Sequence, residues 1–493
     1  MDRSKQSASL ARPAPIALRL KVLAKRAILK GIRIAQSFVI YAVRRLARRP
    51  GAARNLILDA HRSIGNALEE SIPEHWRLQL PRNAFTIGVE ALNQGDLIGS
   101  HRAFAFAQHL AADADSIFYE GLTRSLLELK AAAERKAGEI LSRADGRPHF
   151  VFSAVVWGDE YIDNFMGYMM RSLLAPGNLP ALNDANAHLS IITTPAGAER
   201  IKTKPSFAGL QRYAQVHFFT FSEELTKPFH YSRPNYHFYR LYGALDHTSI
   251  HFARALGAAI FFIVVDGILS SNTLGTLRRY LDEGYDICAN ASIVSNRETL
   301  LPALDELYGK SEAISIAARE LANLGLQHVH HYTEQRLVIE QNRSFDKYPR
   351  ELYFPTADGL VVHAIYQHPL VISARAICSD VKFDYFIVDS KLMARIFSDA
   401  REFKRLKVIK DSAEAYVANF APRTRVFDAT GRPLNIDDFV AVHLESAPIH
   451  HYIWQHRQLL RCDTSLRTHL DPAQVSRDFL DALVARLAKE RHV

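Results

Sequence analysis

Asp266 is the residue whose type and position point most directly to chemistry. It comes directly after the apolar run 258–265 and before a glycine. A buried strand that ends in a carboxylate supplies the hard oxygen ligand that Mg²⁺ or Mn²⁺ prefers, and such a cation can bridge a protein to a diphosphate. Asp266 could instead cap the helix expected over residues 273–281, although Ser271 or Asn272 could cap that helix unaided.

Three further candidates follow or end another apolar run, residues 149–157. The indole of Trp157 could stack on a nucleotide base, or it could belong to the hydrophobic core. Asp159 and Glu160 could accept hydrogen bonds from a ligand. They also suit the first turn of the helix that follows, where the helix dipole favours acidic side chains. Both interpretations of each residue stay open at this point.

Histidines are frequent in the last third of the chain and invite a zinc interpretation. No HExxH motif occurs and the nearby acids do not recur at ligand spacing, so a zinc site is not supported. The alternating run 359–369 is interpreted as one strand that ends at His368 and Pro369. His363 and His368 are five residues apart and should face opposite sides of that strand. Because proline cannot continue the hydrogen bonds of a central strand, His368 is expected at an edge and His363 in the core.

The elements that must position these residues follow from hydrophobic periodicity. The expected strands are 149–157, 188–194, 215–221 and 258–265, and the expected helices are 162–174, 236–256 and 273–281. Strands that are apolar along their full length and alternate with helices indicate an α/β fold, with a mostly parallel sheet covered on both faces. In such sheets ligands bind beyond the carboxyl ends of the strands, which is where Asp266 is expected.

Several common motifs are absent from the sequence. No GxGxxG follows the first strand, and the chain contains neither GxxxxGK[ST] nor GxSxG. These absences argue against the usual dinucleotide fingerprint, the P-loop and the nucleophile of an α/β-hydrolase. A divalent cation is the remaining common way for such a sheet to hold a phosphorylated ligand.

Three segments of the expected sheet domain share their order and residue types with one known class of enzyme. They are WGDEY at 157–161, SLLAPGNLPAL at 172–182 and FIVVDGILS at 262–270. The stretch from about residue 149 to 390 resembles bacterial nucleotide-sugar glycosyltransferases of the GT-A fold. The resemblance implies a nucleotide-sugar donor near Trp157, Asp159 and Glu160, and a metal, Mn²⁺ or Mg²⁺, held by Asp266. In that fold the metal motif is commonly Asp-x-Asp, whereas Val264 stands here in place of the first carboxylate.

The resemblance also implies a histidine from the C-terminal side of the domain on the same metal, and His368 is the better of the two candidate positions. Two later carboxylates are candidates for the catalytic base. An inverting transfer needs a base on the acceptor hydroxyl, whereas a retaining transfer does not. Asp389 is the first candidate and Asp384 the second, and either could instead cap a helix over residues 390–397.

The first 54 residues form a basic arm. They hold fourteen Lys and Arg side chains and one acid, Asp2, for a net charge of +13; since the chain as a whole carries +9, the remainder carries −4. A helical period puts apolar side chains on one stripe of the arm and most basic side chains off it, which is typical of a helix on an anionic membrane surface. A disordered leader or a helix docked on the protein itself are the alternatives. No aromatic residues interleave with the charge, so nucleic acid is not an expected partner.

Composition sets the scale of the molecule. With 493 residues, 48% of them hydrophobic, the chain has room for two or three folded units, which excludes a disordered or collagen-like protein. Three widely spaced cysteines support neither a disulfide framework nor a structural zinc site. The expected units are the arm 1–54, a helical region 55–147 with one tetratricopeptide-like hairpin, a GT-A-like domain 148–410 with a helical insert at about 301–324, and a mostly helical extension 411–493.

The sequence therefore predicts a cytoplasmic glycosyltransferase, peripheral on the inner face of the cell membrane. It would move a sugar from a nucleotide sugar to a glycan, lipid-linked or surface-polysaccharide acceptor. The alternative is a membrane-associated interaction protein whose GT-A-like domain has lost catalysis. The lone Asp266 favours that alternative, and the three matching segments favour the enzyme.

Overall fold

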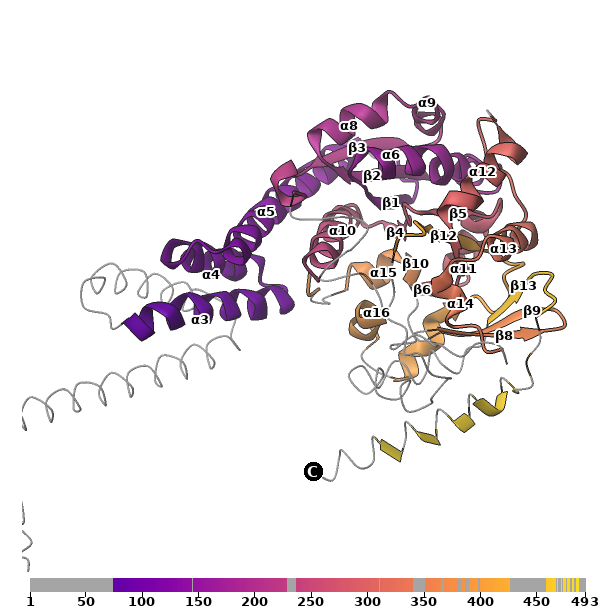
Figure 1. Ribbon diagram of the computed structural model, residues 1–493. Coiled ribbons are helices and arrows are strands. Elements are labelled where there is room, and N and C mark those ends of the chain that lie inside the picture. Colours follow the sequence, from indigo (N-terminus) through magenta and orange to yellow (C-terminus); the bar gives the residue numbers. More distant parts are fainter. Residues whose placement is uncertain are drawn as a thin grey trace, which may run out of the picture.

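Seven strands form the central sheet of the computed structural model, in the order β11-β6-β10-β4-β1-β2-β3 (Figure 1). The structure describes residues 74–143, 145–227, 236–309, 311–339, 351–364, 368–379, 383–385, 388, 390–397, 400–425 and 458–466, with further positions between 468 and 486. The seven strands are β1 (His149–Val155), β2 (Asn186–Thr193), β3 (Gln215–Thr220), β4 (Ala259–Phe262), β6 (Ile287–Asn290), β10 (His368–Ile372) and β11 (Leu406–Val408). The expected α/β class with a mostly parallel sheet is confirmed.

The direction of the strands defines where the sheet can bind a ligand. Six strands run parallel, and β10 runs antiparallel between β4 and β6. From β1 the chain moves outward to β2 and β3, and then returns to place β4 on the other side of β1. The strand order therefore reverses between β1 and β4, and the carboxyl ends of these two strands flank a topological switch point.

Alternation along β1 divides the core between the two faces of the sheet. Val151 and Val155 pack into one cluster with helix α10, whereas Phe150 and Phe152 pack into another with the helices that follow β1. The first face is covered by α10 (Tyr236–Leu256), α15 (Ala374–Ile377) and α16 (Ser390–Ile396). The second face is covered by α6 (Asp159–Asn164), η1 (Phe165–Met169), α7 (Met170–Leu173), η2 (Leu179–Leu182), α8 (Pro195–Lys202), α9 (Pro205–Gln211) and α11 (Thr273–Asp282). Both faces are buried, as full-length apolar strands require.

Two small sheets flank the main one. The first has the order β5-β12-β7 and joins β5 (Gly267–Leu269), β12 (Val417–Ala421) and β7 (Val294–Asn296). The second has the order β13-β9-β8 and joins β13 (Gln458–Arg461), β9 (Gly359–Ala364) and β8 (Glu351–Thr356). Three helices pack against these small sheets: α12 (Arg297–Tyr308), α13 (Ala318–Gln327) and α14 (His331–Glu334). Two short helices lie elsewhere: η3 (Glu223–Leu225) follows β3, and η4 (Ala400–Arg405) precedes β11.

The expected helical extension from residue 411 contains two strands, β12 and β13, whereas the positions described between 473 and 486 are helical. β12 pairs with β5 and β7, and β13 pairs with β9, so both strands complete sheets begun earlier in the chain. The expected helical insert at about 301–324 corresponds to α12 and α13. A short strand that only completes a distant sheet has little periodicity of its own, which is why β12 was not predicted from the sequence.

The expected single strand over residues 359–369 is also wrong, because the run belongs to two sheets. His363 lies in β9 and is buried against the ring of Phe354, whereas His368 begins β10 in the main sheet. The argument from opposite faces of one strand therefore does not apply. β10 is a central strand, and its pairing with β6 shifts register between Pro369 and Val371, so the proline lies at an irregular strand start. His368 pairs in register with Asn290, the last residue of β6, which puts its backbone at the carboxyl edge of the sheet.

Three helices precede the sheet and extend to one side of it (Figure 1). They are α3 (Glu74–Asn93), α4 (Leu97–Leu110) and α5 (Ala114–Leu141). The hydroxyl of Ser100 donates to the carbonyl of Gly88 at 2.8 Å, so α3 and α4 approach closely where glycine leaves room. The fully buried Arg240 of α10 donates to the side chain of Asn93 and so fastens α3 to the α/β body. The basic arm, residues 1–54, lies outside the described residues.

Among the helices described, none combines the length and the apolar character that crossing a bilayer demands.

Candidate functional site

Asp266 lies in the turn between β4 and β5, at the carboxyl end of β4. Its side chain is partly buried, and its backbone carbonyl accepts a hydrogen bond of 2.8 Å from the N–H of Phe420 in β12. Helix α11 begins at Thr273 and its N-cap is Asn272. The capping interpretation of Asp266 is therefore wrong. Its carboxylate belongs instead to the switch point between β1 and β4, where ligands bind in sheets of this kind.

The loop after β1 brings a second set of side chains to the same edge. Gly158 adopts a φ of 80°, a conformation that favours glycine, and α6 begins at the next residue. Glu160, in the first turn of α6, pairs with Nη1 of Arg297 at 2.7 Å. Burial and the nearby charge of Asp266 raise the pKa of Tyr161 to about 12. The phenol of Tyr161 therefore keeps its proton at neutral pH and can donate a hydrogen bond.

A turn after β12 carries a partly buried arginine, Arg425, whose charge interacts with that of Asp266. The N–H of Arg425 donates to the carbonyl of Pro422 at 2.9 Å, and the N–H of Arg423 donates to Oε2 of Glu298 at 2.8 Å. Nδ1 of His330 accepts a backbone N–H, so its Nε2 carries the proton and donates to the carbonyl of Pro422 at 3.1 Å. Burial lowers the pKa of His330 to about 4, so this ring is neutral at pH 7. The turn is thus held in place before any ligand arrives.

The guanidinium of Arg425 donates a hydrogen bond to Tyr239 and interacts electrostatically with Asp266. Its Nη2 donates to the phenol oxygen of Tyr239, in the first turn of α10, at 2.9 Å. Burial alone would lower the pKa of Arg425, but Tyr239 and the carboxylate of Asp266 outweigh burial and raise it. The side chain is therefore always charged. Together with their neighbours these residues form what we call the carboxyl-edge cluster: Glu160, Tyr161, Tyr239, Asp266, Arg297 and Arg425.

The chemistry of the carboxyl-edge cluster suits an anionic ligand. Each guanidinium offers donors in a planar fork that matches carboxylate and phosphate oxygens. Tyr161, Tyr239 and Arg425 are all partly buried rather than sealed in the core, so a ligand can reach them. Phosphate and carboxylate groups are the anions whose oxygens such donors match.

The structure assigns two of the other donor-site candidates to different surroundings. Trp157 is 4% exposed and packs against Phe221, Phe238 and Tyr242, so its ring belongs to the core and has no open face for a nucleotide base. Asp159 is highly exposed and lies 3.4 Å from Arg200. Glu160 is the candidate from this loop that joins the carboxyl-edge cluster, through its ion pair with Arg297.

The candidate bases are not brought to Asp266 by any contact that the structure describes. The carboxylate of Asp384 pairs with Arg395 at 3.1 Å, and its backbone carbonyl accepts from Arg240. Asp389 lies outside the described residues, and so does the side chain of His368. The base assignment to Asp389 and the metal-ligand assignment to His368 therefore stay predictions.

A divalent cation was expected at Asp266, and the neighbouring donor set does not fit one. The carboxylate interacts electrostatically with the guanidinium of Arg425 and with the phenol of Tyr161, and the other acid of the cluster, Glu160, is engaged by Arg297. Mg²⁺ and Mn²⁺ prefer several oxygen ligands and are repelled by a fixed positive charge. Within the part of the chain whose side chains are described, no group of three or more His, Cys, Asp or Glu could hold a metal ion.

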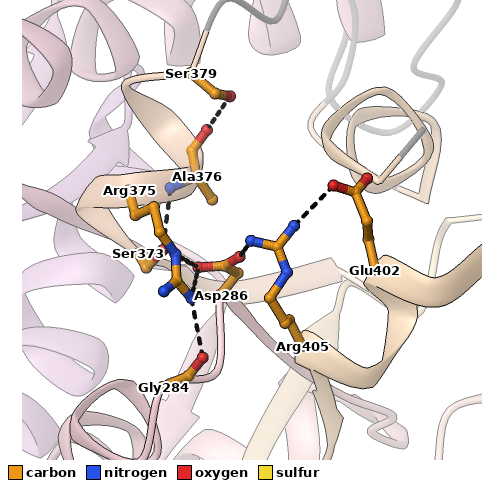
Figure 2. A network of polar contacts seen from close by, with 8 residues as sticks. All are labelled: Gly284, Asp286, Ser373, Arg375, Ala376, Ser379, Glu402 and Arg405. Carbon is orange, nitrogen blue, oxygen red and sulfur yellow. Dashed lines mark hydrogen bonds and ion pairs between the residues drawn. The ribbon is translucent and has the colours of Figure 1, made fainter. Parts of the chain in front are cut away.

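A second polar cluster lies at the opposite, amino edge of the same sheet (Figure 2). Asp286 precedes β6, Ser373 follows the antiparallel β10, and Arg405 precedes β11. The carboxylate of Asp286 accepts from Ser373 at 2.7 Å, from Nε and Nη2 of Arg375 at 2.9 and 2.7 Å, and pairs with Arg405. We call Asp286, Ser373, Arg375 and Arg405 the amino-edge cluster. It ties three strands together.

The residues that the sequence did not reveal are Tyr161, Tyr239, Arg297 and Arg425. Tyr161 lies beside Glu160 in a segment that the sequence singled out, so a nearby signal existed. Arg425 and Arg297 come to the same edge of the sheet as Asp266 because β12 and β7 join the sheet that β5 begins. No local spacing encodes that meeting.

No model of a known protein family matches the chain, and a search of curated proteins finds no similar sequence.

Proposed function

We propose that the protein is a glycosyltransferase that takes a sugar from a nucleotide-sugar donor through a GT-A-like α/β domain. The observation that carries the proposal is the carboxyl-edge cluster, which gathers two arginines, two tyrosines and Asp266 at the switch point between β1 and β4. A nucleotide sugar carries a diphosphate, and this cluster offers donors for one. The single antiparallel strand in an otherwise parallel sheet and the carboxylate after the fourth strand are further support.

The chemical roles follow from the donors that each residue offers. Arg425 and Arg297 would bind the diphosphate oxygens and favour departure of the nucleoside diphosphate, because they stabilise the charge that develops on the leaving group. Tyr161 keeps its proton and would donate a hydrogen bond to the same group. A base on the acceptor hydroxyl is needed for an inverting transfer, and Asp389 remains the candidate.

The acceptor is proposed to be a glycan, a lipid-linked sugar or a surface polysaccharide. The basic arm would hold the enzyme on the anionic inner face of the cell membrane, where a lipid-linked acceptor lies. The competing function is a membrane-associated interaction protein with a degenerate GT-A-like domain. The absence of an acidic metal cluster among the described side chains is the observation that favours it.

Calorimetric titration of the full-length protein with UDP, GDP, CDP and ADP tests the donor class. One of the four should bind with a Kd in the micromolar range. When the protein is given the matching nucleotide sugar and an acceptor extract, transfer of the sugar should release that nucleoside diphosphate. Binding without any release of nucleoside diphosphate would favour the degenerate alternative. If none of the four binds at millimolar concentration, the proposed function is wrong.

A further inference from the structure

We propose that the positive charge for the donor's diphosphate comes from Arg425, supported by Arg297, in place of a divalent cation. The inference rests on the proposed function for the identity of the ligand, but the anion site itself is defined by the residues of the carboxyl-edge cluster. Donor binding is then independent of metal. The diphosphate is the group recognised, and inorganic pyrophosphate is the smallest probe of that recognition.

Arg425 is built into the site more firmly than a surface arginine. The turn that carries it is fastened by Glu298 and His330, and its guanidinium is fixed by the phenol of Tyr239 at 2.9 Å. A side chain ordered beforehand loses little conformational freedom when a ligand binds, so more of the interaction appears as affinity.

Arg297 supplies the second charge from another element. Its side chain is 15% exposed, and its two terminal nitrogens are shared between Glu160 at 2.7 Å and Glu298 at 3.0 Å. Glu298 is the residue that also fastens the turn of Arg425 through the N–H of Arg423. The two arginines are therefore linked through one carboxylate, which couples α12 to the turn after β12.

Asp266 acts as a positioning residue in this arrangement. Its carboxylate lies within electrostatic reach of Arg425 and Tyr161, and it helps to keep the guanidinium charged and oriented. A cation at Asp266 would stand beside a guanidinium that cannot lose its charge, and two like charges at close range repel. A diphosphate at the same place is attracted. The lone carboxylate and the valine at position 264 are thereby explained together.

The test is calorimetric titration of the full-length protein with inorganic pyrophosphate and with the nucleoside diphosphate that binds best, in EDTA and in Mn²⁺. Wild-type protein should bind both probes in EDTA, and Mn²⁺ should change either Kd by less than threefold. Arg425→Gln should weaken both at least tenfold, which corresponds to about 1.4 kcal/mol. Asp266→Asn should still bind pyrophosphate in EDTA and gain no response to Mn²⁺.

Controls separate a local effect from a loss of charge or of folding. Arg279→Gln removes the same charge from an exposed position on α11 and should leave both Kd values unchanged. Thermal unfolding of each variant reports folding. If Arg425→Gln does not fold, Arg425→Lys keeps the charge but loses the planar fork, and it should still weaken binding several-fold.

Four outcomes decide the matter. Binding that requires Mn²⁺ would overturn the inference, and so would a folded Arg425→Gln variant with wild-type affinity. Failure of wild-type protein to bind pyrophosphate would overturn it as well. Arginine-dependent pyrophosphate binding with no binding of any nucleoside diphosphate would keep the anion site and reject the proposed function.

Discussion

The two edges of the central sheet each combine one aspartate with two arginines, yet they are built for different ends. At the amino edge, the side chain of Asp286 is 1% exposed and accepts from Ser373 and Arg375 while it pairs with Arg405 (Figure 2). At the carboxyl edge, Asp266 is only partly buried, and Arg425 is held by the phenol of Tyr239. At the amino edge, the groups of the cluster bond to one another, which stabilises the fold. At the carboxyl edge, Tyr239 positions the guanidinium of Arg425, which has further N–H groups to offer a ligand.

Backbone contacts reinforce the contrast. The N–H of Ser373 donates to the carbonyl of Asp286 at 2.7 Å, and the N–H of Asp286 donates to the carbonyl of Arg405 at 2.8 Å. The amino-edge cluster thus extends the hydrogen bonding of β6, β10 and β11. The carboxyl-edge cluster is assembled from the turn before β5, the turn after β12 and the first turns of α6, α10 and α12, and not from neighbouring strand ends.

The largest expected effect comes from breaking the amino-edge cluster. Asp286→Asn should lower the free energy of unfolding by about 3 kcal/mol, because removing one partner of a buried charged network leaves the others uncompensated. Denaturant unfolding measures the change. Asp282→Asn, which breaks an exposed pair with Arg278, is the matched control and should cost about 0.5 kcal/mol or less. The folded fraction of Asp286→Asn should bind pyrophosphate as wild type does. If the variant is fully folded but binds pyrophosphate more weakly, the amino edge contributes to ligand binding and the contrast between the two edges is wrong.

The part of the fold that was predicted from sequence is the part with strong local patterns. The apolar runs of β1, β2 and β3 and the long period of α10 were recognised with nearly correct bounds, because each is a continuous local pattern; β1 and β2 are also buried along almost their full length. β9 and β10 were merged because alternation continues across residues 359–369, although the two strands pair with different partners. Partner choice is a tertiary property that alternation does not encode.

The candidate site was predicted only in outline for the same reason. Asp266 was singled out because it ends an apolar strand, which is a local signal. Arg425 follows a strand of five residues that was not expected, and Tyr239 reads as one more aromatic residue of a helix. The sequence left Trp157 either on a stacking surface or in the core, and the aromatic residues of α10 cover it. Its burial depends on the packing of a distant helix.

A second expected effect concerns acid stability, and it also arises from the amino half of the sheet. His149, His188 and His217 form a row across β1, β2 and β3, with ring nitrogens 2.9 and 3.2 Å apart. Burial, together with the charges of His217 and His149, lowers the pKa of His188 from 6.5 to about 3. The folded state therefore resists protonation that the unfolded chain accepts below pH 6.5.

The stability that this row contributes is complete above pH 6.5 and is lost as the pH falls from 6.5 toward 3. His188 alone should account for about 2 kcal/mol of unfolding free energy between pH 8 and pH 5. His188→Phe removes the titrating group and should flatten that part of the curve, as measured by urea unfolding at several pH values. An equal slope in wild type and variant would show that the row has no part in acid stability.

The smallest expected effect is on pyrophosphate affinity at the carboxyl edge. Tyr239→Phe removes only the hydroxyl that holds Arg425, so pyrophosphate affinity should fall about threefold, in line with the loss of one hydrogen bond to a charged group that keeps its other contacts. The free energy of unfolding should change by less than about 1 kcal/mol. Tyr213→Phe, at an exposed position on the surface, is the matched control and should leave affinity unchanged. Affinity equal to wild type in Tyr239→Phe would mean that this phenol does not order the guanidinium.

Hydrogen exchange of the full-length protein, with and without saturating pyrophosphate, tests the central claim most directly, because it reports where on the sheet a ligand binds. If the anion site lies at the carboxyl-edge cluster, amide exchange should be slower with pyrophosphate in residues 158–163, 264–268 and 420–425. The exchange rates of residues 284–288 and 373–376 at the amino edge should not change. Protection at the amino edge, or none in the three carboxyl-edge segments while pyrophosphate is bound, would contradict the central claim.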